Sequence, residues 1–140
     1  MRIYLKRTIL CILTICGLFS FIGCGSAVES EPVQVTDLTQ ISDTMLYATL
    51  VNIVNDAPSH IGETIRFSGV AVSEAVNDMV YHAVLVSDVT ACCSVGLEYE
   101  LPEQNYPEDN TAVTVQGVFD TYVDEYDGYT YCVLRNAEIK

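Results

Sequence analysis

From residue 64 onward, the apolar residues of this chain recur at every second position, in segments separated by turn-forming residues. Side chains on a β-strand point alternately to the two faces of a sheet, so this period predicts strands with one buried face. The expected strands lie at residues 64–73, 79–87, 94–101, 112–123 and 129–134. These five strands are too few for an immunoglobulin-type sandwich of two sheets.

Two of the expected strands are long and carry a glycine near the middle, Gly69 in the first and Gly117 in the fourth. A glycine inside a strand marks a bulge or a sharp bend. Such bends let a small sheet coil into a barrel, and closing the barrel removes the exposed strand edges. We therefore expect an all-β fold with a small α contribution, namely a five-stranded OB-like barrel.

A single short helix is expected before the first strand, at residues 43–55. Its apolar residues Leu46, Leu50 and Val54 lie four positions apart and form one face of a helix. Pro58 ends the helical pattern, because proline cannot continue the backbone hydrogen bonding. The folded domain is therefore expected to cover residues 43–140.

The first 23 residues have the pattern of an export signal, with three of the six basic residues in the first seven positions. The uncharged apolar stretch 8–22 follows, and it is shorter than the roughly 20 residues of a membrane-spanning helix. Gly23 and Cys24 resemble the cleavage site of bacterial lipoproteins. The resemblance implies that a signal peptide, residues 1–23, is removed and that Cys24 carries acyl chains such as palmitate. The protein would then be anchored on the extracytoplasmic face of the bacterial cell membrane. An uncleaved signal anchor is the alternative.

The charge of the remaining chain is strongly one-sided. Only three basic residues, Arg66, Arg135 and Lys140, follow residue 23, whereas all 19 acidic residues do. Nucleic-acid binding needs lysine and arginine to neutralise phosphates, so no nucleic acid is expected as a partner. A cationic partner or another envelope protein fits this charge, and so does a surface that merely keeps an exported protein soluble. The polar, acidic residues 24–42 predict a flexible tether.

Two segments carry a resemblance to a known group of proteins. Residues 55–69 are NDAPSHIGETIRFSG, and residues 90–99 are TACCSVGLEY. These segments resemble uncharacterised bacterial envelope lipoproteins that have an OB-like domain and a T-A-C-C-x-x-G segment, although Glu63 stands where that group usually has lysine. The resemblance covers about residues 43–140. It implies a fold and a location, and it implies no activity.

Three cysteines of the expected domain are the strongest candidates for chemistry. Neighbouring residues on a straight strand point to opposite faces, so Cys92 and Cys93 can reach one metal ion only at a bend. If the last strand runs near the start of the third, Cys132 meets one of them. Three thiols, with or without His82 or His60, suit zinc or copper. An exported protein can also form a Cys92–Cys132 or Cys93–Cys132 disulfide, and plain packing of buried thiols is the third interpretation.

The expected strands and their last hairpin also carry many tyrosines. Cross-strand aromatic pairing explains most of them. A barrel face lined by tyrosine would also suit recognition, because tyrosine is favoured at interfaces. The six residues are Tyr81, Tyr99, Tyr122, Tyr126, Tyr129 and Tyr131.

The sequence contains none of the common catalytic motifs: no G-x-S-x-G elbow, no H-E-x-x-H pair, no phosphate loop and no dinucleotide fingerprint. We therefore predict that the protein is not an enzyme. The expected function is that of a lipid-anchored cell-envelope protein carrying a small OB-like binding or interaction module. The alternative is a metal-handling or thiol-redox lipoprotein that uses Cys92, Cys93 and Cys132.

Overall fold

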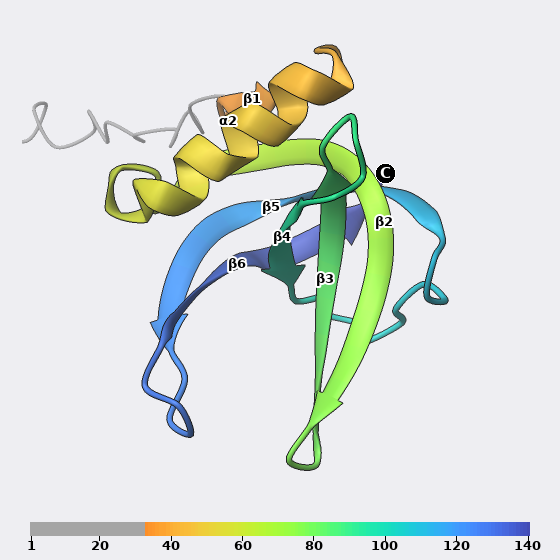
Figure 1. The fold of residues 1–140 in the computed structure, drawn as a ribbon. Coiled ribbons are helices and arrows are strands. Elements are labelled where there is room, and N and C mark those ends of the chain that lie inside the picture. Colours follow the sequence, from red (N-terminus) through yellow and green to blue (C-terminus); the bar gives the residue numbers. More distant parts are fainter. Residues whose placement is uncertain (1–32) are drawn as a thin grey trace, which may run out of the picture. The chain divides into compact units, whose positions relative to one another are not determined.

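The computed structural model describes residues 33–140 and confirms the expected all-β barrel (Figure 1). The barrel strands are paired in the order β2-β3-β4-β6-β5, and β5 pairs back onto β2 to close the barrel. All neighbours are antiparallel except β4 and β6, which run parallel. The strands are β2 (Thr64–Val76), β3 (Met79–Ser87), β4 (Ser94–Tyr99), β5 (Ala112–Val123) and β6 (Thr130–Ile139).

Strand β2 bends sharply and belongs to both halves of the barrel (Figure 1). It pairs with β5 over Thr64–Val70 and with β3 over Val70–Val76. Gly69 lies beside the residue where β2 changes partner. The position of this glycine confirms the expectation that it marks the bend of a coiled strand.

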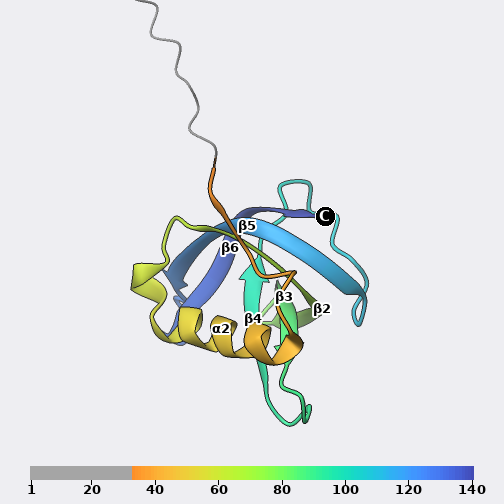
Figure 2. The same ribbon diagram turned by 90° about the horizontal axis from the view of Figure 1, so that it is seen from above.

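The α-helix α2 (Asp43–Asn55) precedes the barrel strands, as expected. Ser42 caps it, because its Oγ accepts the backbone N–H of Met45 at 3.4 Å. A short 3₁₀ helix, η1 (Ala57–Ser59), follows. Seen from the α2 side, α2 lies across one end of the barrel, next to β3 and β4 (Figure 2). In the described part of the chain, no helix combines the length and the hydrophobicity needed to cross a membrane.

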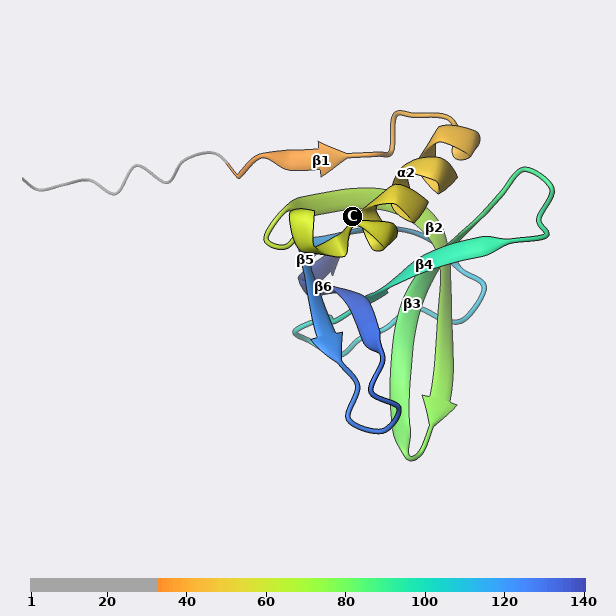
Figure 3. The ribbon, with the colours of Figure 1, turned by 60° about the vertical axis from the view of Figure 1, so that its left-hand side comes forward.

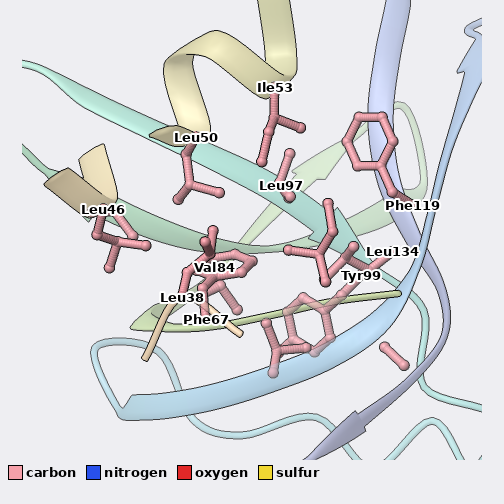
Figure 4. Packing of buried hydrophobic residues seen from close by; sticks show 14 of the residues in the cluster. Leu38, Leu46, Leu50, Ile53, Phe67, Val84, Leu97, Tyr99, Phe119 and Leu134 are labelled. Atoms are coloured by element: carbon pink, nitrogen blue, oxygen red, sulfur yellow. The ribbon is translucent and has the colours of Figure 1, made fainter. Parts of the chain in front are cut away.

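The hydrophobic core joins α2 to the inner face of the barrel. Leu46, Leu50 and Ile53 point from the helix toward strand residues such as Leu97 and Val84 (Figure 4). The sequence pattern predicted that Val54 faces the core. In the structure Ile53 is buried and Val54 is only partly buried. The largest fully buried side chains are Phe67, Phe119, Leu50, Ile65, Leu97, Leu134, Val84, Val115 and Val133.

The folded domain begins earlier than expected. Within the segment predicted to be a tether, β1 (Val35–Asp37) forms a strand parallel to the start of β2. Asp37 accepts a hydrogen bond from Arg66 of β2 at 3.0 Å, and Leu38 is buried. Because β3 pairs with β2 only from Val70 onward, the edge of β2 before Val70 is free for β1. Residues 24–32 of the predicted tether lie outside the described residues.

The last strand is longer than the predicted 129–134. β6 continues to Ile139 through an irregularity, where the register with β5 shifts between Gln116 and Val118. Asn136 takes a positive φ of 49° at this point. The bulge interrupts the period-two pattern, which is why the sequence alone ends the strand early.

Two hairpins project from the barrel on the side opposite α2 (Figures 1 and 3). One joins β2 to β3 through Asn77 and Asp78, and the other joins β5 to β6 through residues 124–129. Asn77 and Asp78 both have positive φ, as tight hairpin turns require. The two hairpins frame the candidate functional site.

Candidate ligand groove and cysteine loop

A groove lies between the two hairpins. Its two parts have volumes of about 720 and 380 Å³. Residues of β3, β4 and the β5–β6 hairpin line both parts, and the side chain of Tyr106 from the loop after β4 lines the larger one. The residues common to both parts are Met79, Tyr81, Glu98, Tyr122, Asp124 and Tyr126.

Tyrosine hydroxyls and carboxylates pair across this groove. Tyr122 of β5 donates to Oε2 of Glu98 on β4 at 2.7 Å. Tyr81 of β3 donates to Oδ2 of Asp124 in the β5–β6 hairpin at 3.1 Å, and so links that hairpin to β3. The sequence predicted a tyrosine-rich face among acidic residues, and the fold shows that Glu98 and Asp124 are the acidic side chains that pair with it.

The side chains that line the groove give it a negative charge. Burial raises the pKa of the half-buried Glu98 carboxyl, and the nearby charges of Asp124 and Glu100 raise it further, against the opposing hydrogen bond from Tyr122. Backbone N–H groups of Tyr126 and the next residue lower the pKa of Asp124. Burial and the bond to Glu98 raise the pKa of Tyr122. The phenol groups of Tyr81 and Tyr122 therefore stay protonated and donate to the carboxyl groups of Asp124 and Glu98.

His82 belongs to the aromatic wall of the groove. Its ring stacks on Tyr106 with centroids 3.5 Å apart, and its Nδ1 lies 2.9 Å from Oγ of Ser73. Burial lowers the pKa of His82, which keeps the ring neutral. Met79 begins β3, whereas the two adjacent cysteines follow its far end, so His82 and the cysteines belong to different sites. His60 lies in the turn before β2, 3.2 Å from Glu63 and edge-on to Phe119.

The adjacent cysteines lie in the loop between β3 and β4, and both are exposed. Their Sγ atoms are 3.5 Å apart, and Cys92 Sγ is 3.4 Å from Oδ2 of Asp88. Ligand atoms of Asp88, Cys92 and Cys93 all lie within 4.8 Å of one another. Sequence reasoning missed Asp88; the available signal was an aspartate four residues before Cys92, at the start of the same loop.

The structure does not bring Cys132 to the adjacent cysteines. Val133 of β6 is opposite Glu98 in the parallel pair with β4, so Cys132 is level with Leu97. Cys93 lies four residues before Leu97, a distance of roughly 13 Å along a strand. That exceeds the roughly 7 Å between Cα atoms that a disulfide can span. All three cysteines are free, so the expected three-thiol site and the Cys92–Cys132 or Cys93–Cys132 disulfide are absent from the described residues.

Cys132 instead has a packing role. It is partly buried against the hydrophobic core. Burial raises the pKa of its thiol, with a smaller contribution from the charge of Glu98. A thiol packed in this way acts as a small apolar side chain of the core.

Comparison with protein-family models and with curated proteins gives no match to this chain. Function is therefore inferred from the chemistry of the groove and of the cysteine loop. These two sites lie at opposite ends of β3: the groove includes Met79 at the start of the strand, and the cysteine loop follows Ser87 at the end of the strand.

Proposed function

We propose that this protein is a lipid-anchored envelope binding module that holds a cationic ligand in the groove between its two hairpins. The observation that carries the proposal is the composition of the groove. Tyrosines and carboxylates dominate its lining, and none of the lining residues, all within residues 33–140, is lysine or arginine. We infer a non-enzymatic role, that of holding an ammonium- or guanidinium-bearing partner.

The position of the groove supports this proposal. Barrels of the OB type take ligands on the face formed by their second and third strands, between the loops after the first and fourth strands. In this protein those elements are β3, β4 and the two hairpins, which are the elements around the groove. This correspondence is an analogy between folds and does not identify a ligand; the side chains of the groove do that.

The side chains favour a cation. The faces of tyrosine rings attract ammonium and guanidinium groups. Burial raises the pKa of the Glu98 carboxyl, and the charges of Asp124 and Glu100 add to this effect while the charge of Arg135 opposes it. A bound cation would relieve this repulsion and form charge-assisted hydrogen bonds with the same carboxylates. The chain itself contains such a contact between a cation and a tyrosine ring: the guanidinium of Arg135 lies 5.6 Å from the centre of the Tyr122 ring.

A fluorescein-labelled oligolysine peptide is expected to bind the protein, and the double variant Glu98→Gln/Asp124→Asn is expected to bind it at least about tenfold more weakly. A hydrogen bond to a charged group contributes about 1.5–3 kcal/mol, so losing two such partners has an effect of this size or larger. The measurement is a titration by fluorescence anisotropy, at fixed and low ionic strength.

The matched control removes the same amount of charge elsewhere. Asp56 and Glu108 are exposed and do not line the groove, so Asp56→Asn/Glu108→Gln should weaken binding by less than about twofold. Circular dichroism and thermal melting establish that both double variants fold. If both double variants weaken peptide binding equally, or if the parent protein does not bind the peptide, the groove is not a cation site.

The lipid anchor is proposed on the Gly23–Cys24 sequence, which lies outside the described residues. Two acyl chains hold a protein stably on a membrane, where a single chain is marginal. Cells fed labelled palmitate should label the parent protein, and Cys24→Ser should lose the label completely and keep residues 1–23. Cys16→Ser, which changes a thiol in the expected signal peptide, should still be labelled. Labelling that survives Cys24→Ser contradicts the anchor.

A further inference from the structure

The loop between β3 and β4 folds back on itself and brings its two thiols together. The Asp88 N–H donates to the carbonyl of Cys93 at 2.9 Å, and the Ala91 N–H donates to the carbonyl of Asp88 at 3.0 Å. Ala91 takes a positive φ of 53°, which turns the chain just before the cysteines. On a straight strand, Cys92 and Cys93 would point apart. The turn instead places their Sγ atoms 3.5 Å from each other.

These separations match those between the ligands of a tetrahedral zinc ion. With zinc–sulfur bonds of about 2.3 Å, two thiolates of a tetrahedral site lie about 3.8 Å apart. With a zinc–oxygen bond of about 2.1 Å, a thiolate and a carboxylate oxygen lie about 3.6 Å apart. The protein has 3.5 Å between the two Sγ atoms, and 3.4 Å between Cys92 Sγ and Asp88 Oδ2.

A linear copper(I) site fits less well. Copper(I) bound by two opposite thiolates at a similar bond length would need sulfurs about 4.6 Å apart. The Sγ atoms of Cys92 and Cys93 are about an ångström closer than that, at 3.5 Å. The carboxylate of Asp88 also favours zinc, because a hard oxygen ligand suits a borderline-soft divalent ion better than it suits copper(I).

The carboxylate of Asp88 is held in place by its neighbours. Its Oδ1 accepts the backbone N–H groups of Thr90 at 3.2 Å and Cys92 at 3.1 Å. The Thr90 hydroxyl lies 3.0 Å from Oδ2 as a donor. Such outer partners orient the ligands of protein metal sites.

We propose that Asp88, Cys92 and Cys93 form an exchangeable zinc(II) site on the β3–β4 loop, separate from the ligand groove. Three protein ligands leave the fourth tetrahedral position open, and both cysteines are exposed. Closed four-ligand sites are structural, whereas an open exposed site allows the ion to be taken up and passed on. The site adds a metal-handling activity to the proposed binding module, and it includes Asp88 in place of Cys132.

The test uses the full chain, reduced and stripped of metal, titrated with Zn²⁺ and separately with Cu⁺ in competition with a chromophoric chelator. One Zn²⁺ should bind per chain. Cys92→Ser and Cys93→Ser should each weaken zinc binding by more than about a hundredfold, and Asp88→Asn by about tenfold or more. Cobalt in place of zinc should give the thiolate charge-transfer bands and the strong d–d bands of a tetrahedral site.

Cys132→Ser is the matched control, and its zinc affinity should equal that of the parent. Every variant keeps the other cysteines of the chain, so a difference is assigned to the replaced residue. Thr90→Val removes a hydrogen bond to Asp88 but no ligand, and should keep the one-to-one stoichiometry. The proposal is overturned if reduced protein binds no zinc, if binding survives Cys92→Ser/Cys93→Ser, if it depends on Cys132, or if Cu⁺ binds and Zn²⁺ does not.

Discussion

Replacing Leu50 by alanine is expected to lower the free energy of unfolding by about 3 kcal/mol or more. The Leu50 side chain is 0% exposed and lies at the centre of the contact between α2 and the barrel (Figure 4). Truncating it removes buried apolar surface and leaves a cavity that neighbours such as Val84 and Leu97 cannot fill without moving. Urea denaturation followed by circular dichroism measures the change.

Met45 on the same helix provides the control. Its side chain is 57% exposed, so Met45→Ala should change stability by no more than about 0.5 kcal/mol. Both substitutions introduce the same residue, with high helix propensity, so the difference between them reports packing. Similar small effects of the two substitutions would show that α2 is not an integral part of the barrel core.

Replacing Gly69 by alanine is expected to destabilise the protein by about 3 kcal/mol, because the new Cβ has no space. A Cβ built at Gly69 lies 2.5 Å from the carbonyl oxygen of Leu85 and 2.7 Å from Cγ1 of Val84. The first of these neighbours is backbone of the paired strand β3. Relief of the overlap requires β2 and β3 to separate where β2 bends. The change in stability is measured by the same urea titration.

Gly96→Ala is the informative comparison. The closest neighbour of a Cβ at Gly96 is Cδ2 of Leu85, the end of a flexible side chain that can rotate away, although the carbonyl oxygen of Val84 lies 3.0 Å away. We expect Gly96→Ala to destabilise the protein by less than half as much as Gly69→Ala. If the two variants are equally stable, the close approach of β2 to β3 at Gly69 does not control the fold.

The bend at Gly69 also bears on the proposed function. Beyond it, β2 continues with β3 into the hairpin at Asn77 and Asp78, and this hairpin forms one side of the groove. The other side is the β5–β6 hairpin, which Tyr81 and Asp124 link to β3. A disturbance at the bend should therefore reduce both stability and peptide binding. Glu98→Gln/Asp124→Asn keeps an acceptor oxygen at each position for the tyrosine hydroxyls, so it should reduce binding far more than stability.

Most of the barrel could be predicted from local patterns. The period-two segments at 79–87 and 112–123 are strands with those bounds, and the helix spans the predicted 43–55. The pattern did not reveal β1, because three residues are too short to show a period. It also ended β6 early, because the register shift between Gln116 and Val118 of β5 breaks the alternation.

The candidate sites were harder to predict than the fold. The sequence indicated a tyrosine-rich face and the Cys92–Cys93 pair, but it did not show that Glu98 and Asp124 line the same groove as Tyr122. It also joined Cys132 to the pair. Whether two strand residues meet depends on the register between strands, and a register is a relation between distant segments that no local period contains.

What the amino-acid sequence determined by itself is local: where strands and the helix form, which face of each is apolar, and that 19 acidic residues outnumber six basic ones. These properties follow from side-chain periodicity and composition, which need no partner segment. The tertiary structure alone decided that β1 fills the free edge of β2, that Cys132 lies away from the other two thiols, and that the two hairpins enclose a groove. Each of these outcomes depends on the pairing of segments that are distant in the sequence; the parallel pairing of β4 with β6, for example, places Cys132 level with Leu97.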